Sequence, residues 1–113
     1  QLWKKEYAEL GNHPKIDNVL IFENKGKVIG VSNPHPHGQI YATGFVPRIV
    51  RRELDSFSAY RKSHGEGLLE AILREELKKG TRIVCQNEHF VAFIPFFACF
   101  VYETYIVPRR HVA

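Results

Sequence analysis

The octapeptide SNPHPHGQ at residues 32–39 constrains the backbone of this chain more than any other stretch. Proline fixes its own φ angle and pushes the residue before it into extended geometry, so His35 is extended. In extended backbone the side chains alternate between the two sides of the chain. We therefore expect His35, His37 and Gln39 to form a row on one side.

A row of two imidazoles and a carboxamide suits nucleophilic attack on phosphorus and would make a poor hydrophobic core. The neutral imidazole of His37 is a nucleophile near pH 7, provided that one ring nitrogen is free and the other donates a hydrogen bond that fixes the tautomer. Gly38 lacks the Cβ that would crowd an approaching phosphate, and Gln39 brings an NH2 donor for a phosphoryl oxygen. Two alternatives stay open: a general-base role for His37, and a pair of surface histidines in a proline-rich turn.

Several segments of the chain resemble one known family. The residues FENKG at 22–26 and GVSNPHPHGQI at 30–40 are similar to the galactose-1-phosphate uridylyltransferase family of the histidine-triad superfamily. Shorter matches follow at FVP (45–47), RRE (51–53), EHF (88–90) and PRRHV (108–112). The hydrolase branch of the superfamily carries a third histidine where this chain has Gln39, so the glutamine favours the transferase branch.

This resemblance implies a nucleotidyltransferase of the galactose (Leloir) pathway, which would be a cytoplasmic homodimer. His37 would attack the α-phosphorus of UDP-glucose and form a uridylyl-histidine, and galactose 1-phosphate would then take the uridylyl group. Two other functions stay open. One is a related nucleoside-diphosphate-sugar phosphorylase or nucleotidyl hydrolase of the same superfamily, and the other is a non-catalytic nucleotide-binding fragment.

Further positions match residues that hold the nucleotide and its phosphates in the family. They are Asn24, Gly30, Val31 and Ser32, and Gln39 shares this substrate-binding role. Gly30 allows a close approach of the backbone, and Ser32 supplies a hydroxyl donor. Without the resemblance, Asn24 would be an ordinary turn residue.

Two residues match metal ligands of the family. The resemblance implies that His35 binds zinc, with partner ligands upstream of Gln1, and that Glu53 binds a second metal such as iron, with partners beyond Ala113. A structural zinc site needs three or four ligands. In this chain alone, we therefore expect His35 to act as a hydrogen-bonding residue and Glu53 to be a surface carboxylate of a helix.

Composition and charge narrow the range of possible binding partners. The chain carries 16 basic and 12 acidic residues, a net charge of +4, which fits a solvated surface or an anionic substrate. No motif supports a nucleic-acid partner. Cys85 and Cys99 lie in apolar runs, which is typical of buried, reduced thiols in a cytosolic protein. The longest apolar run, residues 90–102, is too short to span a bilayer, so no membrane partner is expected.

The pattern of elements predicts an α+β fold, an antiparallel sheet with flanking helices. The expected helices cover residues 2–10 and 51–61, and a third helix is expected to start at the polar break of residues 63–66 and to stop at Gly80, with Leu68, Leu69, Ile72, Leu73 and Leu77 on its apolar face. The expected strands cover residues 19–23, 27–31, 38–46, 82–86, 90–95 and 102–107. A glycine-containing turn at 24–26 would join the first two strands in a hairpin.

The resemblance adds a division of the chain. Residues 1–62 would be the C-terminal part of one histidine-triad-like domain, and residues 63–113 the N-terminal part of a second, tandem domain. Because the family is about three times longer, we expect the chain to be a piece of a larger enzyme. The intact enzyme would share its sites between two subunits.

Overall fold

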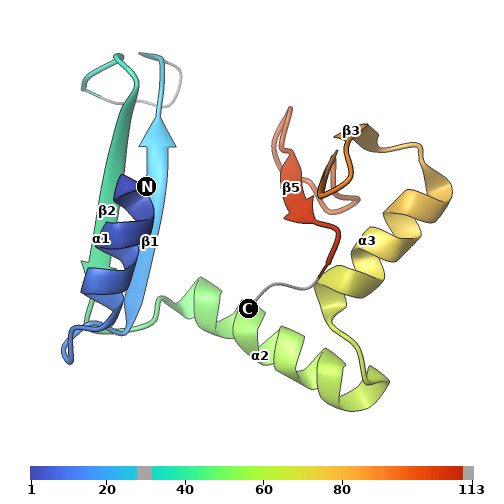
Figure 1. Cartoon of the computed structure of the whole chain (residues 1–113), viewed down its shortest axis with the longest axis horizontal. Helices are drawn as coiled ribbons and strands as arrows, with labels where there is room; N and C mark the ends of the chain where they lie inside the picture. The colour runs from blue at the N-terminus through green and yellow to red at the C-terminus, as the bar shows by residue number, and fades with distance from the viewer. Residues whose placement is uncertain (28–31, 111–113) are drawn as a thin grey trace. The chain divides into compact units, whose positions relative to one another are not determined.

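The computed structural model describes residues 1–27 and 32–110. The contacts divide the chain into two compact units, Gln1–Leu54 and Asp55–Ala113, and each unit has its own antiparallel sheet (Figure 1). Helix α2 (Arg48–His64) contains the point of division. Helices and antiparallel strands together confirm the predicted α+β class.

The first unit contains helix α1 (Leu2–Gly11) and strands β1 (Asn18–Asn24) and β2 (His37–Thr43). The two strands form an antiparallel pair in which Asn24 lies opposite His37 and Asn18 lies opposite Thr43. Helix α1 packs against this pair, with the ring of Trp3 beneath the backbone of Gly38. One face of the sheet is thus partly covered near the end where β2 begins.

The predicted hairpin pairing of residues 19–23 with residues 27–31 falls largely on residues 28–31, which lie outside the described part of the chain. In the described part, strand β1 pairs along its whole length with β2, and Lys27 lies outside any strand. A glycine turn is a local signal, and it does not reveal whether the next segment or a later one supplies the partner strand. Here the N–H of Gly26 donates to the carbonyl of Pro34 across 3.0 Å.

Strand β2 also ends earlier than predicted, at Thr43 rather than Val46. Gly44 lies so close to the preceding loop that a Cβ there would be 2.8 Å from the backbone oxygen of Lys15. This close approach of two backbones is the reason that the residue after the strand is glycine.

The second unit contains helix α3 (Leu68–Lys79) and the strands β3 (Ile83–Gln86), β4 (Phe90–Phe93) and β5 (Tyr105–Pro108). The strands form an antiparallel sheet in the order β3-β4-β5. Glu70 begins the helix by accepting the backbone N–H of Gly67 at 2.9 Å. Gly80 ends it in the left-handed conformation, φ 70°, that favours glycine.

Apolar residues of helix and sheet meet in the core of the second unit. Leu73, Val91 and Phe93 are buried there, and the partly buried side chains around them are Ile72, Leu77, Ile83, Tyr105 and Val107. One charged residue, Glu76, shares this interior with only 2% of its surface exposed. Its carboxylate accepts hydrogen bonds from Arg82 Nε at 2.9 and 3.1 Å and from Arg82 Nη2 at 2.9 Å. The buried charge is thereby paired.

Three further predictions differ from the structure. Cys85 and Cys99 are exposed rather than buried, because Cys85 lies in the exposed part of β3 and Cys99 lies in a loop. The last strand begins at Tyr105, not Tyr102, which has a positive φ of 65° and lies in a turn. Helix α2 is longer than predicted and continues through the expected boundary at 62/63. The assignment of the two parts to tandem histidine-triad-like domains stays a prediction. In the described part, no helix is both long and apolar enough to cross a membrane.

Candidate functional site

The strand register gathers three of the predicted site residues on one face of the first sheet. His37 opens β2 and lies opposite Asn24, while Gln39 lies two residues further along the same strand. Residues that lie opposite each other, and residues two apart on one strand, project to the same face. All three are partly buried. The side chains of His37, Gln39 and Asn24 therefore form one polar group at the end of the sheet.

The ring of His37 has a defined tautomer. Its Nδ1 lies 2.7 Å from the backbone oxygen of His35. A carbonyl oxygen only accepts hydrogen bonds, so Nδ1 must carry the hydrogen, and in the neutral ring the lone pair is on Nε2. This is the arrangement that the nucleophile hypothesis requires.

Gln39 is oriented by Asn24. The Asn24 side chain donates from Nδ2 to Gln39 Oε1 at 2.9 Å across the two strands. Because the carbonyl end of the Gln39 amide is occupied in this way, its NH2 end is directed to another acceptor. Asn24, predicted to contact the nucleotide, thus has a second task within the site.

His35 is held by a tight local turn. Its backbone N–H donates to Asn33 Oδ1 at 3.0 Å, and its own Nδ1 donates to the carbonyl of Pro36 at 3.0 Å. Because β2 begins at His37, the strand alternation applies to His37 and Gln39 only, and His35 lies in the loop before them. The strand therefore carries only two of the three residues that were predicted to form a row, His37 and Gln39.

Gly38 lies against the ring of Trp3. A Cβ at Gly38 would lie 3.3 Å from Trp3 Cζ2 and 3.6 Å from Trp3 Nε1. The missing side chain therefore makes room for the indole ring, and its expected role in the approach of a phosphate stays a prediction.

The remaining predicted residues are not brought into this group. Ser32 is exposed in the loop before β2, and Glu53 is exposed on α2. Gly30 and Val31 lie outside the described residues. Across residues 1–27 and 32–110, no three His, Cys, Asp or Glu side chains come together as metal ligands would. One imidazole and one carboxylate do not make a metal site, so the described residues alone do not fit the zinc or the second metal.

Two residues of the site were missed by the sequence reasoning. Asn33 could have been found, because asparagine commonly accepts a hydrogen bond from the N–H two residues later. Trp3 gave no such signal, because its contact with Gly38 joins segments 35 positions apart and exists only in the folded chain.

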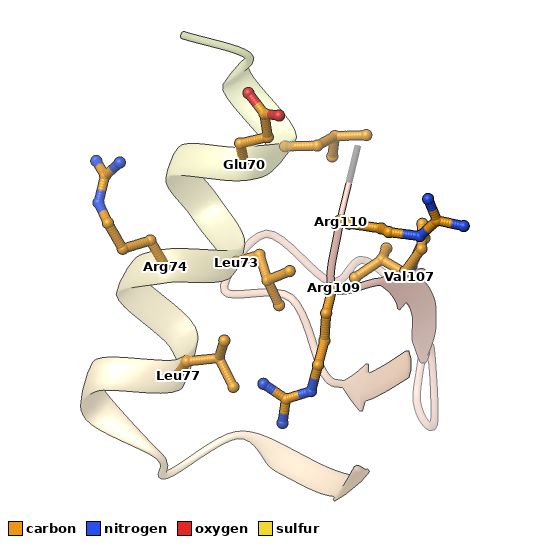
Figure 2. Close-up of a pocket in the computed structure, with 9 residues that line it drawn as sticks. Glu70, Leu73, Arg74, Leu77, Val107, Arg109 and Arg110 are labelled. Carbon is orange, nitrogen blue, oxygen red and sulfur yellow. The ribbon is translucent and has the colours of Figure 1, made fainter. Parts of the chain in front are cut away.

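The second unit holds a separate pocket of about 520 Å³ between α3 and the end of β5. Figure 2 shows Leu73 and Leu77 directed from the helix toward Arg109, with the guanidinium group of Arg74 turned outward. Two of the three arginines that line the pocket have partners within the unit. Arg109 donates to the backbone oxygen of Asn87, and Arg74 is paired with Glu66. Leucines of α3 give the pocket an apolar wall, and the guanidinium groups of Arg74 and Arg109 are already occupied by their partners.

Sequence models of one family match nearly the whole chain. The model of the galactose-1-phosphate uridyl transferase N-terminal domain matches residues 1–47, and the model of the C-terminal domain matches residues 53–113. The galactose-1-phosphate uridylyltransferase of Haemophilus influenzae is 42% identical over 112 residues, which are 99% of this chain and 32% of that protein.

Solved structures agree with these matches. A structure of a uridylyltransferase has a TM-score of 0.84 and 39% identity, with 96% of this chain and 33% of that chain covered. An ADP-glucose phosphorylase from Arabidopsis thaliana, solved with bound ADP-glucose, has a TM-score of 0.81 and 28% identity, with 99% of this chain and 34% of that chain covered. The chain spans about a third of the length of these relatives.

Proposed function

Because the chain belongs to the galactose-1-phosphate uridylyltransferase family, we propose that it is part of an enzyme that moves UMP from UDP-glucose to galactose 1-phosphate through His37. The observation that best supports this proposal is the hydrogen bond of 2.7 Å between His37 Nδ1 and the backbone oxygen of His35. It keeps the lone pair of the ring on Nε2, where a nucleophile needs it.

In the first half-reaction, Nε2 of His37 attacks the α-phosphorus of UDP-glucose. A nitrogen–phosphorus bond forms, and the bond from that phosphorus to the bridging oxygen breaks. The oxygen leaves with the electron pair as part of glucose 1-phosphate. The ring then carries a positive charge that it shares with Nδ1–H, and the His35 carbonyl stabilises this charge through the existing hydrogen bond.

Gln39 binds the phosphoryl group during the same step. With its carbonyl oxygen held by Asn24, the NH2 group can donate to an oxygen of the α-phosphate. Such a donor stabilises the negative charge on the equatorial oxygens as the in-line displacement proceeds. The donor is oriented before the substrate arrives, so no binding energy is spent on turning it.

In the second half-reaction, a phosphate oxygen of galactose 1-phosphate attacks the uridylyl phosphorus, and the bond to Nε2 breaks. UDP-galactose leaves, and His37 regains its neutral ring. Because both half-reactions use the same nitrogen, the kinetics are ping-pong. Ser32, together with Gly30 and Val31, completes the phosphate contacts of this proposal.

A related nucleoside-diphosphate-sugar phosphorylase is the second candidate, since the chain also superposes on an ADP-glucose phosphorylase. Both candidates pass through a nucleotidyl-histidine, and they differ in the acceptor. The zinc ligand role of His35, the second metal at Glu53, a homodimer and a cytoplasmic location follow from the family alone and belong to the same proposal.

The uridylyl-histidine can be tested directly in the enzyme that carries this chain. UDP-glucose labelled in the α-phosphate should leave label on the protein that is stable to base and released by acid, in a peptide containing His37. A chase with galactose 1-phosphate should move the label to UDP-galactose. Label released by inorganic phosphate as UDP would favour the phosphorylase, and the absence of protein-bound label would contradict both.

Exchanging Gln39 for histidine should weaken transfer and raise hydrolysis of the uridylyl intermediate. Glutamine donates to a phosphoryl oxygen but does not accept a proton from water, whereas histidine does both. In a reaction without acceptor, UMP release from UDP-glucose should rise by about 10-fold or more. Gln39→Leu, which can neither donate nor act as a base, is the control and should lower both rates. Unchanged UMP release and unchanged transfer would remove Gln39 from the mechanism.

A further inference from the structure

On the face of the first sheet opposite the proposed nucleophile, the ring of Trp3 lies against the backbone of Gly38 while 45% of the residue stays exposed. Trp3, the only tryptophan of the chain, has three ring atoms at 3.3 to 3.7 Å from the position that a Cβ of Gly38 would occupy. Gly38 links the residues that carry the imidazole and the carboxamide. We propose that Trp3 is a positioning residue, which sets the place of His37 through the backbone of Gly38; this inference rests on the proposed function of His37.

The need for support arises from where His37 lies. It is the first residue of β2, and in the described part of the chain its pair with Asn24 is the last of the β1–β2 ladder. The end pair of a ladder has neighbours on one side only, so fewer backbone hydrogen bonds hold it in place. A glycine next to it weakens the strand further, because glycine has no side chain to pack.

The indole replaces the packing that Gly38 lacks. An aromatic ring placed over a glycine in a strand restores apolar contact to the exposed backbone. Here the ring covers the side of the sheet opposite His37 and Gln39, whose side chains are held by hydrogen bonds to His35 and Asn24. The end of β2 is thus held from the open face by hydrogen bonds and from the covered face by Trp3.

This arrangement predicts an effect on rate rather than on substrate affinity. Trp3 does not share a face with the substrate, so removing it leaves the phosphate contacts in place while the strand end gains freedom to move. A displacement of about 1 Å costs on the order of 100-fold in rate. Trp3→Ala should therefore lower kcat by about 10- to 100-fold and change the KM for UDP-glucose little.

Two variants serve as controls. Trp3→Phe keeps an aromatic ring behind Gly38 and should stay within about 3-fold of the wild-type kcat. Tyr7→Ala removes an aromatic ring from the same helix, one turn further along and 56% exposed, and should leave kcat unchanged.

An exchange of side-chain volume between positions 3 and 38 distinguishes a positioning role of Trp3 from a general loss of stability. Gly38→Val alone would drive its side chain into the ring of Trp3 and lower kcat. In the double variant Trp3→Ala with Gly38→Val, the valine occupies the space that the ring has left, so kcat should exceed that of either single variant. If the fold-changes in kcat of the two single variants simply multiply in the double variant, the two residues act independently and the inference is wrong.

The ring signals of His37 in the NMR spectrum decide the inference without any assay of transfer. They should shift in Trp3→Ala and remain in place in Tyr7→Ala. If the wild-type enzyme forms no uridylyl-histidine, the proposed function fails, and the signals still report whether Trp3 positions His37. Unchanged His37 signals in Trp3→Ala, or an effect on KM alone, would overturn the inference.

Discussion

Replacing His37 with alanine should lower uridylyl transfer by at least about four orders of magnitude, because removal of a covalent nucleophile leaves only the contribution of binding and charge stabilisation. Its Nε2 is the atom that the tautomer keeps free, and the described site offers no second imidazole on the same face of the sheet. Steady-state transfer and α-phosphate labelling should both disappear. Near-wild-type turnover in this variant would show that His37 is not the nucleophile.

His35→Ala is the matched control, since it removes the other imidazole of the same loop. It should retain part of the activity, because the contact that His35 makes with His37 comes from its backbone oxygen, which alanine keeps. Some loss is expected, since the side chain of His35 also fixes the loop through the Pro36 carbonyl. Equal losses in the two variants would mean that the His35 ring is as essential as the His37 ring.

Glu76→Ala should destabilise the second unit by about 3 kcal/mol, since breaking a buried ion pair leaves an uncompensated charge. Glu76 is 2% exposed, and its carboxylate is held by three hydrogen bonds from Arg82. Arg82 keeps 33% of its side-chain surface exposed, which places the loss near the lower end of the range for buried pairs. In urea unfolding followed by circular dichroism, the midpoint should fall by roughly 2 M.

Glu66→Ala provides the comparison, because it breaks the ion pair with Arg74 at the surface of the same helix region. The Arg74 hydrogen bond lowers the pKa of Glu66, so any contribution of this pair is present above the ordinary carboxyl pKa and is lost as the pH falls through the lowered value. Solvent screens the pair, and the urea midpoint at neutral pH should change little. A larger effect from Glu66 than from Glu76 would contradict the assignment of the buried pair.

Much of the fold could be predicted because its signals are local. The apolar positions of α3 and the glycine at its end predict that helix and the residue where it stops, since helix periodicity and a left-handed C-cap both depend on near neighbours. The partner of β1 could not be predicted in this way. The sequence of residues 19–23 is equally compatible with a strand beside residues 27–31 and with a strand beside a later segment. Only the tertiary structure pairs them with residues of the segment 37–43.

The same distinction between local and long-range information applies to the candidate site. The sequence by itself determined which groups are proposed to carry the chemistry, because an imidazole, a carboxamide and two prolines are properties of residues 34–39 alone. Only the tertiary structure decided how these groups are held: the Asn24 amide on Gln39, the His35 carbonyl on His37, and Trp3 behind Gly38. The physical reason is that covalent chemistry resides in single residues, whereas their position depends on strand register and helix packing, which join residues far apart in the chain.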